Sequence, residues 1–178
     1  MLYQDEKTVY RQPTQGWLLY PTGRLQPRLK YGAHYNHCMR LVGYLNAVTG
    51  AVHWSDCASV TVERLIQSVR QLPRLYPHAD CIYLVWDNWL NHSQARLLAA
   101  LNQLPRVRVL CLPTYAPWLN PIEKLWRWLS QTVLHAHPWH DDFRELRQQV
   151  AAALNPLAVG SPHLLRYVGL SPADAQQA

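Results

Sequence analysis

Two short apolar runs on either side of a helical pattern constrain the fold most strongly. The runs CIYLVWDN (81–88) and VRVLCLP (107–113) are nearly continuous in apolar residues, which is typical of strands buried on both faces. The segment between them, 91–104, has the pattern of a helix that stops before Pro105. Strands connected through a helix pair in parallel, because parallel neighbours need a crossover connection. The chain is therefore expected to build part of a parallel sheet.

The first third of the chain has the pattern of short strands joined by turns. LYQDE (2–6) is an apolar stretch that ends in acids, and QGWLLYP (15–21) predicts a strand closed by the turn residues PTG. HCMRLVGYLNAVTG (37–50) predicts a strand that ends in a turn, and AVHWSDC (51–57) predicts its hairpin partner. Hairpins imply antiparallel pairing, so this part is expected to add antiparallel strands to the parallel ones.

Helical periodicity predicts three more helices. They are expected over 59–72, with Ser59 as the N-cap, over 120–134 and over about 141–154. Together these elements predict an α/β fold with a mixed sheet and helices on its faces. The domain is expected over residues 1–155, and a Pro- and Ala-rich tail over 156–178.

The charge of the chain favours a polyanionic partner. Its 178 residues include 17 Lys and Arg against 11 Asp and Glu, for a net charge of +6. Basic residues neutralise phosphates and release counterions, so nucleic acid is the natural candidate. A hydrophobic content of 49% excludes intrinsic disorder, and no apolar run approaches the roughly 18 residues of a membrane span. We expect a cytoplasmic protein without a membrane partner.

Three acids fall where the expected elements end or begin. Asp5 ends the first strand, Asp87 ends the strand over 81–88, and Glu123 opens the helix that follows the strand over 107–113. The carboxyl ends of parallel strands are where open α/β sheets place their sites. Three convergent carboxylates repel one another unless divalent cations neutralise them. Two such ions roughly 4 Å apart suit phosphodiester chemistry.

Each acid also has a structural explanation. Asn120 is a good N-cap and Pro121 suits the first helical position, which puts Glu123 at the capping-box position. Asp87, followed by Asn88, is also able to start a strand-to-helix turn. Asp5 lies near the terminus, where a solvated charge is common. Spacing alone leaves these alternatives open.

Three motifs in this chain resemble a known family. LYQDE, VWDNWLNH and LPTYAPWLNPIEKLW together resemble the catalytic domain of IS630/Tc1/mariner transposases, whose patterns are a strand ending in DE, DNA-x-x-H and LPxYSPxLNPIExxW. The 35 residues between Asp87 and Glu123 fit the spacing of the family's DDE triad. The resemblance covers about residues 2 to 150. It implies a ribonuclease-H-like fold with a five-stranded mixed sheet, and it makes residues 1–155 a DDE catalytic domain.

The resemblance also implies an activity, a cofactor and partners. Asp5, Asp87 and Glu123 become the ligands of two Mg²⁺ or Mn²⁺ ions, with Asp5 bridging both ions and the other two acids holding one each. Water attacks the DNA first, and the freed 3′-hydroxyl then attacks target DNA without a covalent enzyme intermediate. The implied partners are transposon-end and target DNA and a second copy in a homodimer. The implied location is the nucleoid of a prokaryotic cytoplasm.

The chain departs from the family pattern in three places. The second motif has DNW in place of DNA, which puts Trp89 at a position that is normally small, and the third has YAP in place of YSP. The chain begins four residues before Asp5, whereas family members carry helix-turn-helix modules upstream. This leaves open a split-frame product with a separate helix-turn-helix subunit, an isolated domain, a repurposed DNA endonuclease on the same fold, or a catalytically silent DNA-binding remnant.

Further residues are candidates for accessory roles. His92 matches the family histidine and is expected to orient an acid or contact phosphate, unless it is a solvated residue at a helix N-terminus. Glu6 is expected to point to the opposite face of the sheet from Asp5. Asn88 and Asn120 are the other accessory candidates. The candidate DNA contacts, for which loop packing or solvation is the alternative, are Arg24, Arg28, Lys30, Tyr115, Trp118 and Lys124.

Overall fold

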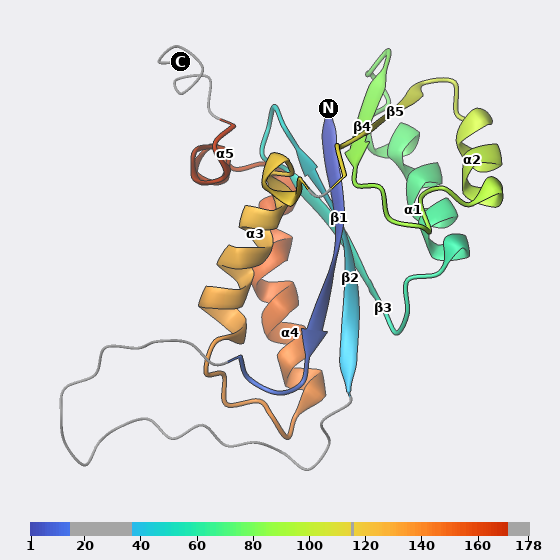
Figure 1. Cartoon of the computed structure of the whole chain (residues 1–178). Helices are drawn as coiled ribbons and strands as arrows, with labels where there is room; N and C mark the ends of the chain where they lie inside the picture. Colours follow the sequence, from blue (N-terminus) through green and yellow to red (C-terminus); the bar gives the residue numbers. More distant parts are fainter. Residues whose placement is uncertain (15–36, 115, 171–178) are drawn as a thin grey trace, which may run out of the picture.

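A five-stranded mixed sheet in the order β3-β2-β1-β4-β5 forms the centre of the molecule (Figure 1). The computed structural model describes residues 1–14, 37–114 and 116–170. The strands are β1 Leu2–Tyr10, β2 Cys38–Asn46, β3 Val52–Cys57, β4 Ile82–Trp86 and β5 Val107–Cys111. β1, β2 and β3 pair in antiparallel fashion, whereas β4 is parallel to both β1 and β5. The predicted mixed sheet flanked by helices is confirmed.

Helices cover the two faces of the sheet over different strands (Figure 1). The helices are α1 Val62–Leu75, α2 Ala95–Asn102, α3 Ile122–Leu129, α4 Phe143–Leu154 and α5 Pro162–Val168. One apolar core joins α1 and α2 to β1, β2, β4 and β5, and includes Leu2, Leu65, Leu84 and Leu97. The other joins α3, α4 and α5 to β1, β2 and β3. Because β1 contributes to both cores, its alternate side chains are held from opposite faces.

Helix α3 approaches the sheet closely because β2 has a glycine beneath it. The buried face of α3 consists of Ile122, Leu125, Trp126 and Leu129. A Cβ atom at Gly43 would lie 2.5 Å from the Trp126 ring, which is closer than real atoms approach. Gly43 is also the β2 partner of Asp5 on β1. The missing side chain therefore lets the indole lie flat against the sheet beside Asp5.

Several element boundaries differ from the predicted ones. β1 continues to Tyr10, so Asp5 lies in the middle of a strand rather than at its end. This extension follows from pairing with β2, whose nine residues match β1 one by one. The N-cap of α1 is Thr61, which accepts from the Arg64 N–H, and not Ser59. The strand predicted over 15–21 lies outside the described residues.

One prediction about burial was also wrong. β5 was predicted to be buried on both faces, but it is the edge strand and most of its side chains are at least partly exposed. β4 is buried except for Tyr83, as predicted, and β1 is the central strand of the sheet. An apolar run indicates a strand but does not indicate the strand's place in the order of the sheet.

The region beyond Asn155 contains regular structure that the sequence prediction left out. A 3-10 turn spans Asn155–Val159, and α5 begins with Ser161, whose side chain accepts from the Leu164 N–H. Leu164, Leu165 and Val168 are buried, and α5 contacts α3. The apolar core thus continues into the predicted tail. None of the helices in the described ranges has the length and apolar character to cross a membrane.

Candidate active site

Strand pairing brings Asp5 and Asp87 to the same place. β1 and β4 pair in parallel with Leu2 opposite Leu84 and Tyr3 opposite Val85. The same register places Asp5 opposite Asp87, which directly follows the last residue of β4. The expectation that the two acids lie side by side is therefore met. It is met because β1 runs past the end of β4, not because both strands end there.

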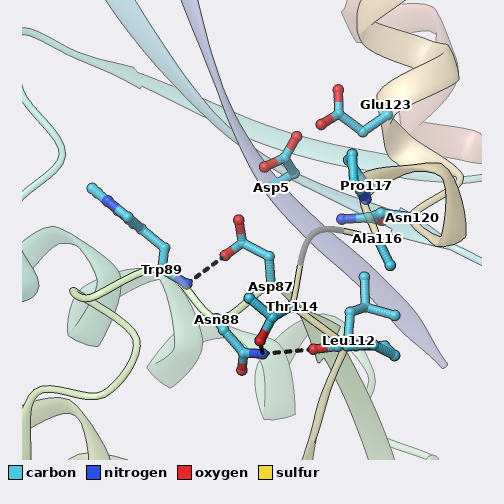
Figure 2. Close-up of a pocket in the computed structure, with 11 residues that line it drawn as sticks. Asp5, Asp87, Asn88, Trp89, Leu112, Thr114, Ala116, Pro117, Asn120 and Glu123 are labelled. Atoms are coloured by element: carbon cyan, nitrogen blue, oxygen red, sulfur yellow. Dashed lines mark hydrogen bonds between the residues drawn. The ribbon is translucent and has the colours of Figure 1, made fainter.

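Glu123 reaches the same pocket from the first turn of α3. Asp5, Asp87 and Glu123 line one cavity of about 260 Å³ together with Asn88, Trp89, Asn120 and the loop that follows β5. Figure 2 shows the Asp5 carboxylate between those of Asp87 and Glu123. The three predicted acids thus come from a strand, a strand end and a helix start, and they share one cavity.

Asn120 fixes where α3 begins. Its side-chain Nδ2 donates to the Gln4 carbonyl of β1 at 3.1 Å, and the residue is 4% exposed. The turn Pro117–Leu119 precedes it, and the Asn120 N–H donates to the Pro117 carbonyl. The predicted N-cap role of Asn120 is therefore wrong, because its side chain binds the neighbouring strand. The capping-box alternative for Glu123 is wrong as well, since the N–H group that it would bind is already bonded to Pro117.

Trp126 is a site residue that the sequence analysis did not single out. Its indole Nε1 donates a 2.9 Å hydrogen bond to Asp5 Oδ2, and its side chain is 1% exposed. It lies one turn after Glu123, so α3 delivers both residues to Asp5. The signal was present in the sequence, because Trp126 is the last residue of the third motif.

The electrostatics of the pocket are dominated by crowding of carboxylates. Burial and the nearby charge of Glu123 raise the pKa of Asp5 to about 7, and Glu6 and Asp87 add to this effect. Within the described ranges, the Glu123 carboxylate has no hydrogen-bond or ion-pair partner. A cation bound near Asp5 and Glu123 would therefore reduce the repulsion between their carboxylates.

His92 is buried against Asp87, which rules out the solvated alternative. Its Nδ1 lies 3.1 Å from Asp87 Oδ1 and 3.0 Å from the Asp87 carbonyl, and the residue is 4% exposed. Burial lowers the pKa of His92, but hydrogen bonds to Asp87 and Glu6 outweigh it and raise this pKa to about 9. The same hydrogen bond from His92 lowers the pKa of Asp87. The structure therefore places His92 where it orients an acid.

Asn88 and Trp89 also line the cavity, and each makes a hydrogen bond that holds the end of β4. Asn88 Nδ2 donates to the Leu112 carbonyl at 2.8 Å and so ties the end of β4 to the loop after β5 (Figure 2). The Trp89 N–H donates to Asp87 Oδ1 at 3.0 Å. Asp87 therefore also starts the turn that was its structural alternative. Asp87 thus lines the cavity and starts the turn at the same time.

The candidate DNA contacts fall into two groups. Trp118 is 75% exposed beside the cavity and is free to meet a ligand. Lys124 instead donates to the Val168 carbonyl at 3.1 Å and so binds the C-terminal end of α5. The remaining candidates, Arg24, Arg28, Lys30 and Tyr115, lie outside the described residues.

The three acids line one cavity, but their side chains are not arranged around a common metal position. In the part of the chain that the structure describes, no group of three or more His, Cys, Asp or Glu side chains is arranged to hold a metal ion. Like charges hold carboxylates apart until a cation neutralises them. The donor set fits divalent cations nevertheless, because it consists of carboxylate oxygens. Burial and the charge of Glu123 raise the pKa of Asp5, and a bound cation would offset both effects.

Comparisons with known proteins agree with this geometry. The family described as DDE superfamily endonuclease matches residues 1–147. An uncharacterized 39 kDa protein of insertion element IS630 from Shigella sonnei is 30% identical over 139 residues, which are 77% of this chain and 39% of the relative.

Two solved structures of Mos1 transposase share the fold. A paired-end complex with the left transposon end has a TM-score of 0.69 at 16% identity, over 99% of this chain and 53% of that one. The Mos1 catalytic domain with Raltegravir and Mn has a TM-score of 0.66 at 14% identity, over 99% of this chain and 79% of that one. The chain covers 39% of the IS630 relative and 53% of the Mos1 chain in the paired-end complex. Its fold is that of the ribonuclease-H-like transposase domains.

Proposed function

The chain belongs to the DDE superfamily endonuclease family, and on this premise we propose that it is the catalytic domain of a metal-dependent DNA transposase. The resemblance to IS630/Tc1/mariner transposases is confirmed by the family match and by the IS630 relative. The proposed reaction is cleavage of a DNA strand by water, followed by attack of the freed 3′-hydroxyl on target DNA. The activity, substrates and partners of the whole protein are part of this proposal.

One observation carries the proposal: Asp5 lies half-buried between two other acids in a single cavity. A carboxylate in that position is held partly neutral, because desolvation and the nearby charge of Glu123 raise the pKa of Asp5 to about 7. A chain with 11 acidic residues gains nothing in stability from such crowding. The arrangement is useful if cations bind there, and the similar Mos1 domain was solved with Mn.

The proposed roles follow from the position of each residue. Asp5, which lies between the other two acids, would hold both ions, while Asp87 and Glu123 would each hold one. A pair of divalent cations, when bound, supplies activation of the attacking oxygen and stabilisation of the leaving oxygen. The chain itself supplies position: Trp126 fixes Asp5, His92 fixes Asp87, and Asn120 fixes the start of the helix that bears Glu123.

The proposed partner is DNA, and the surface near the acids suits it. Lys7, Trp118 and Arg127 line a second cavity that shares Asn120 and Glu123 with the first. Cationic side chains bind phosphates, and an exposed indole provides a surface for base stacking. We further propose that the protein acts as a homodimer on DNA in the prokaryotic nucleoid, and that a helix-turn-helix partner supplies recognition of the transposon ends.

Cleavage of supercoiled plasmid in the presence of Mn²⁺ or Mg²⁺ tests the activity. Wild-type protein is expected to nick the plasmid only with a divalent cation. Glu123→Gln is expected to keep the fold and to lose nicking, because a neutral amide is a poor ligand for these ions. Glu63→Gln, which changes an acid on the exposed surface of α1, is the matched control and should retain activity.

A second assay separates transposase from nuclease. Pre-nicked duplexes that carry the ends of the insertion element present a free 3′-hydroxyl to the protein. Joined products are expected for a transposase, whereas nicking without joining identifies a nuclease on the same fold. Retention of nicking by Glu123→Gln would refute the assignment of this residue.

A further inference from the structure

The two neighbouring acids of β1 serve opposite faces of the sheet. Asp5 faces α3, where Trp126 donates to it. Glu6 points to the other face, because side chains alternate along a strand. There Glu6 Oε1 accepts a 2.7 Å hydrogen bond from Nε2 of Gln4, which is 1% exposed. Glu6 is thus held in place within the protein rather than left in solvent.

His92 lies between Glu6 and Asp87 and faces each with one ring nitrogen. Nε2 lies 3.4 Å from Glu6 Oε1, and Nδ1 lies 3.1 Å from Asp87 Oδ1. The ring is stacked on Trp86 at a centroid distance of 4.3 Å and meets Trp89 edge-on at 5.6 Å. These two indoles prevent the imidazole from turning, so its two hydrogen-bonding directions are fixed.

Asp87 needs such support because packing does little to hold it. It follows the last residue of β4, and its side chain is 53% exposed. In the described part of the chain, its carboxylate is bound by the Trp89 N–H and by His92. The Trp89 bond sets the turn, whereas the His92 bond comes from a buried ring whose other end is fixed by Glu6.

We propose that Glu6 is a positioning residue that acts through His92 to aim the Asp87 carboxylate at the cavity. Glu6 acts from the face of the sheet opposite Asp5. Of the two acids in the first motif, Asp5 therefore lines the cavity, whereas Glu6 supports Asp87 through His92. This inference rests on the proposed function, in which Asp87 holds a divalent cation. The role is distinct from that of a ligand, because the Glu6 carboxylate is engaged by Gln4 and His92, although Glu6 also lines a further cavity with Asp5 and Asp87.

The Mn²⁺ concentration at half-maximal plasmid nicking tests this role, together with the rise in melting temperature on Mn²⁺ addition. Loss of a residue that orients a metal ligand typically weakens metal binding by about 10- to 100-fold. Glu6→Ala is therefore expected to raise two Mn²⁺ concentrations about 10-fold or more. These are the concentration at half-maximal nicking and the concentration that gives a fixed rise in melting temperature, called the Mn²⁺ midpoints below. The shape-preserving Glu6→Gln is expected to raise them less, and it serves as the test variant if Glu6→Ala does not fold. Glu63→Gln is the control and should match wild type.

A double substitution shows whether Glu6 acts through the ring. Once His92→Ala has removed the connection, adding Glu6→Ala is expected to change the Mn²⁺ midpoints less than about 2-fold. Independent effects of the two substitutions would overturn the proposal. So would midpoints in Glu6→Ala and Glu6→Gln within about 2-fold of those of active wild-type protein.

A measurement without metal separates this inference from the proposed function. In metal-free wild-type protein, the proton on His92 Nε2 is expected to exchange slowly enough to give an NMR signal. That signal should shift or disappear in Glu6→Ala and persist in Glu63→Gln. A signal unaffected by Glu6→Ala contradicts the Glu6–His92 contact, whatever the activity. Wild-type protein that neither nicks DNA nor responds to Mn²⁺ overturns the proposed function, and the positioning role with it.

Discussion

Trp126 Nε1 donates a 2.9 Å hydrogen bond to Asp5 Oδ2, and this bond joins α3 to the centre of the sheet at the candidate active site. The indole reaches Asp5 because the residue opposite Asp5 on β2 is Gly43. Gly43, Trp126 and Asp5 thus form a single unit. This unit couples the packing of the fold to the position of the central carboxylate.

Trp126→Phe is expected to loosen Asp5 while the fold persists. The substitution removes the hydrogen-bond donor and leaves an aromatic ring in the core, so unfolding free energy should fall by about 1–3 kcal/mol. The Mn²⁺ midpoint for nicking should rise, because Asp5 loses its fixed orientation. Denaturant unfolding and Mn²⁺ titration measure the two effects. Trp128→Phe, on the less buried side of the same helix, should leave the Mn²⁺ midpoint unchanged.

Gly43→Ala is expected to push Trp126 off the sheet. The new Cβ atom would lie 2.5 Å from the indole, and overpacking of this kind typically costs about 1–3 kcal/mol. A smaller ring relieves the clash, so the double variant Gly43→Ala with Trp126→Phe should lose less stability than the sum of the single losses. Strictly additive losses in denaturant unfolding would contradict the close approach of Trp126 to Gly43.

Asp5→Asn is expected to stabilise the metal-free protein at neutral and alkaline pH. The pKa of Asp5 is about 7 in the folded protein against an ordinary value of 3.8. Between these values the folded state keeps a proton that the unfolded state has released, so stability falls as pH rises from about 4 to about 7. The cost is fully present above this window and amounts to about 2–4 kcal/mol.

The asparagine variant avoids that cost because it carries no charge, and its Oδ1 still accepts from Trp126. Thermal melting at pH 8 should therefore give a higher melting temperature for Asp5→Asn than for wild type, and the difference should vanish below about pH 4. Equal melting temperatures at pH 8 would show that Asp5 is not crowded by the other acids. The variant is expected to be inactive in nicking at every pH.

Lys124→Met is expected to act on stability rather than on DNA binding. Lys124 Nζ donates to the Val168 carbonyl, so its loss should lower unfolding free energy by about 0.5–1.5 kcal/mol through a weaker contact between α3 and α5. Each lysine that binds a phosphate contributes about one unit to the slope of log affinity against log salt. An unchanged slope is expected for Lys124→Met, and a slope reduced by about one would restore Lys124 as a DNA contact.

The sequence predicted the elements well where periodicity and motifs were strong. The strands within 81–88 and 107–113 and the helix that begins near residue 120 were all found, because local pattern determines them. The meeting of Asp5 and Asp87 was predictable as well, since parallel pairing of β1 with β4 brings Asp5 opposite the residue that follows β4, although β1 itself does not end there. That Glu123 joins these two acids was predicted from the resemblance of the third motif to the family pattern.

Features set by distant contacts were missed. β1 extends beyond Asp5 because β2 pairs with it along its whole length, and nothing within residues 2–6 encodes that partner. The Glu6–His92 contact joins residues that are 86 positions apart. α5 was not predicted although Ser161 and Pro162 are a good helix start, because the surrounding sequence is rich in Pro and Ala and the helix is only seven residues long.

Titration of metal-free protein with Mn²⁺, followed by thermal melting, tests the central claim most directly. A cation that binds only the folded state raises the melting temperature with concentration. Wild-type protein is expected to show this rise, and Asp87→Asn is expected to abolish it while Glu63→Gln preserves it. A wild-type melting temperature that does not respond to Mn²⁺, or an equal response in Asp87→Asn, would contradict the claim that the three acids hold divalent cations.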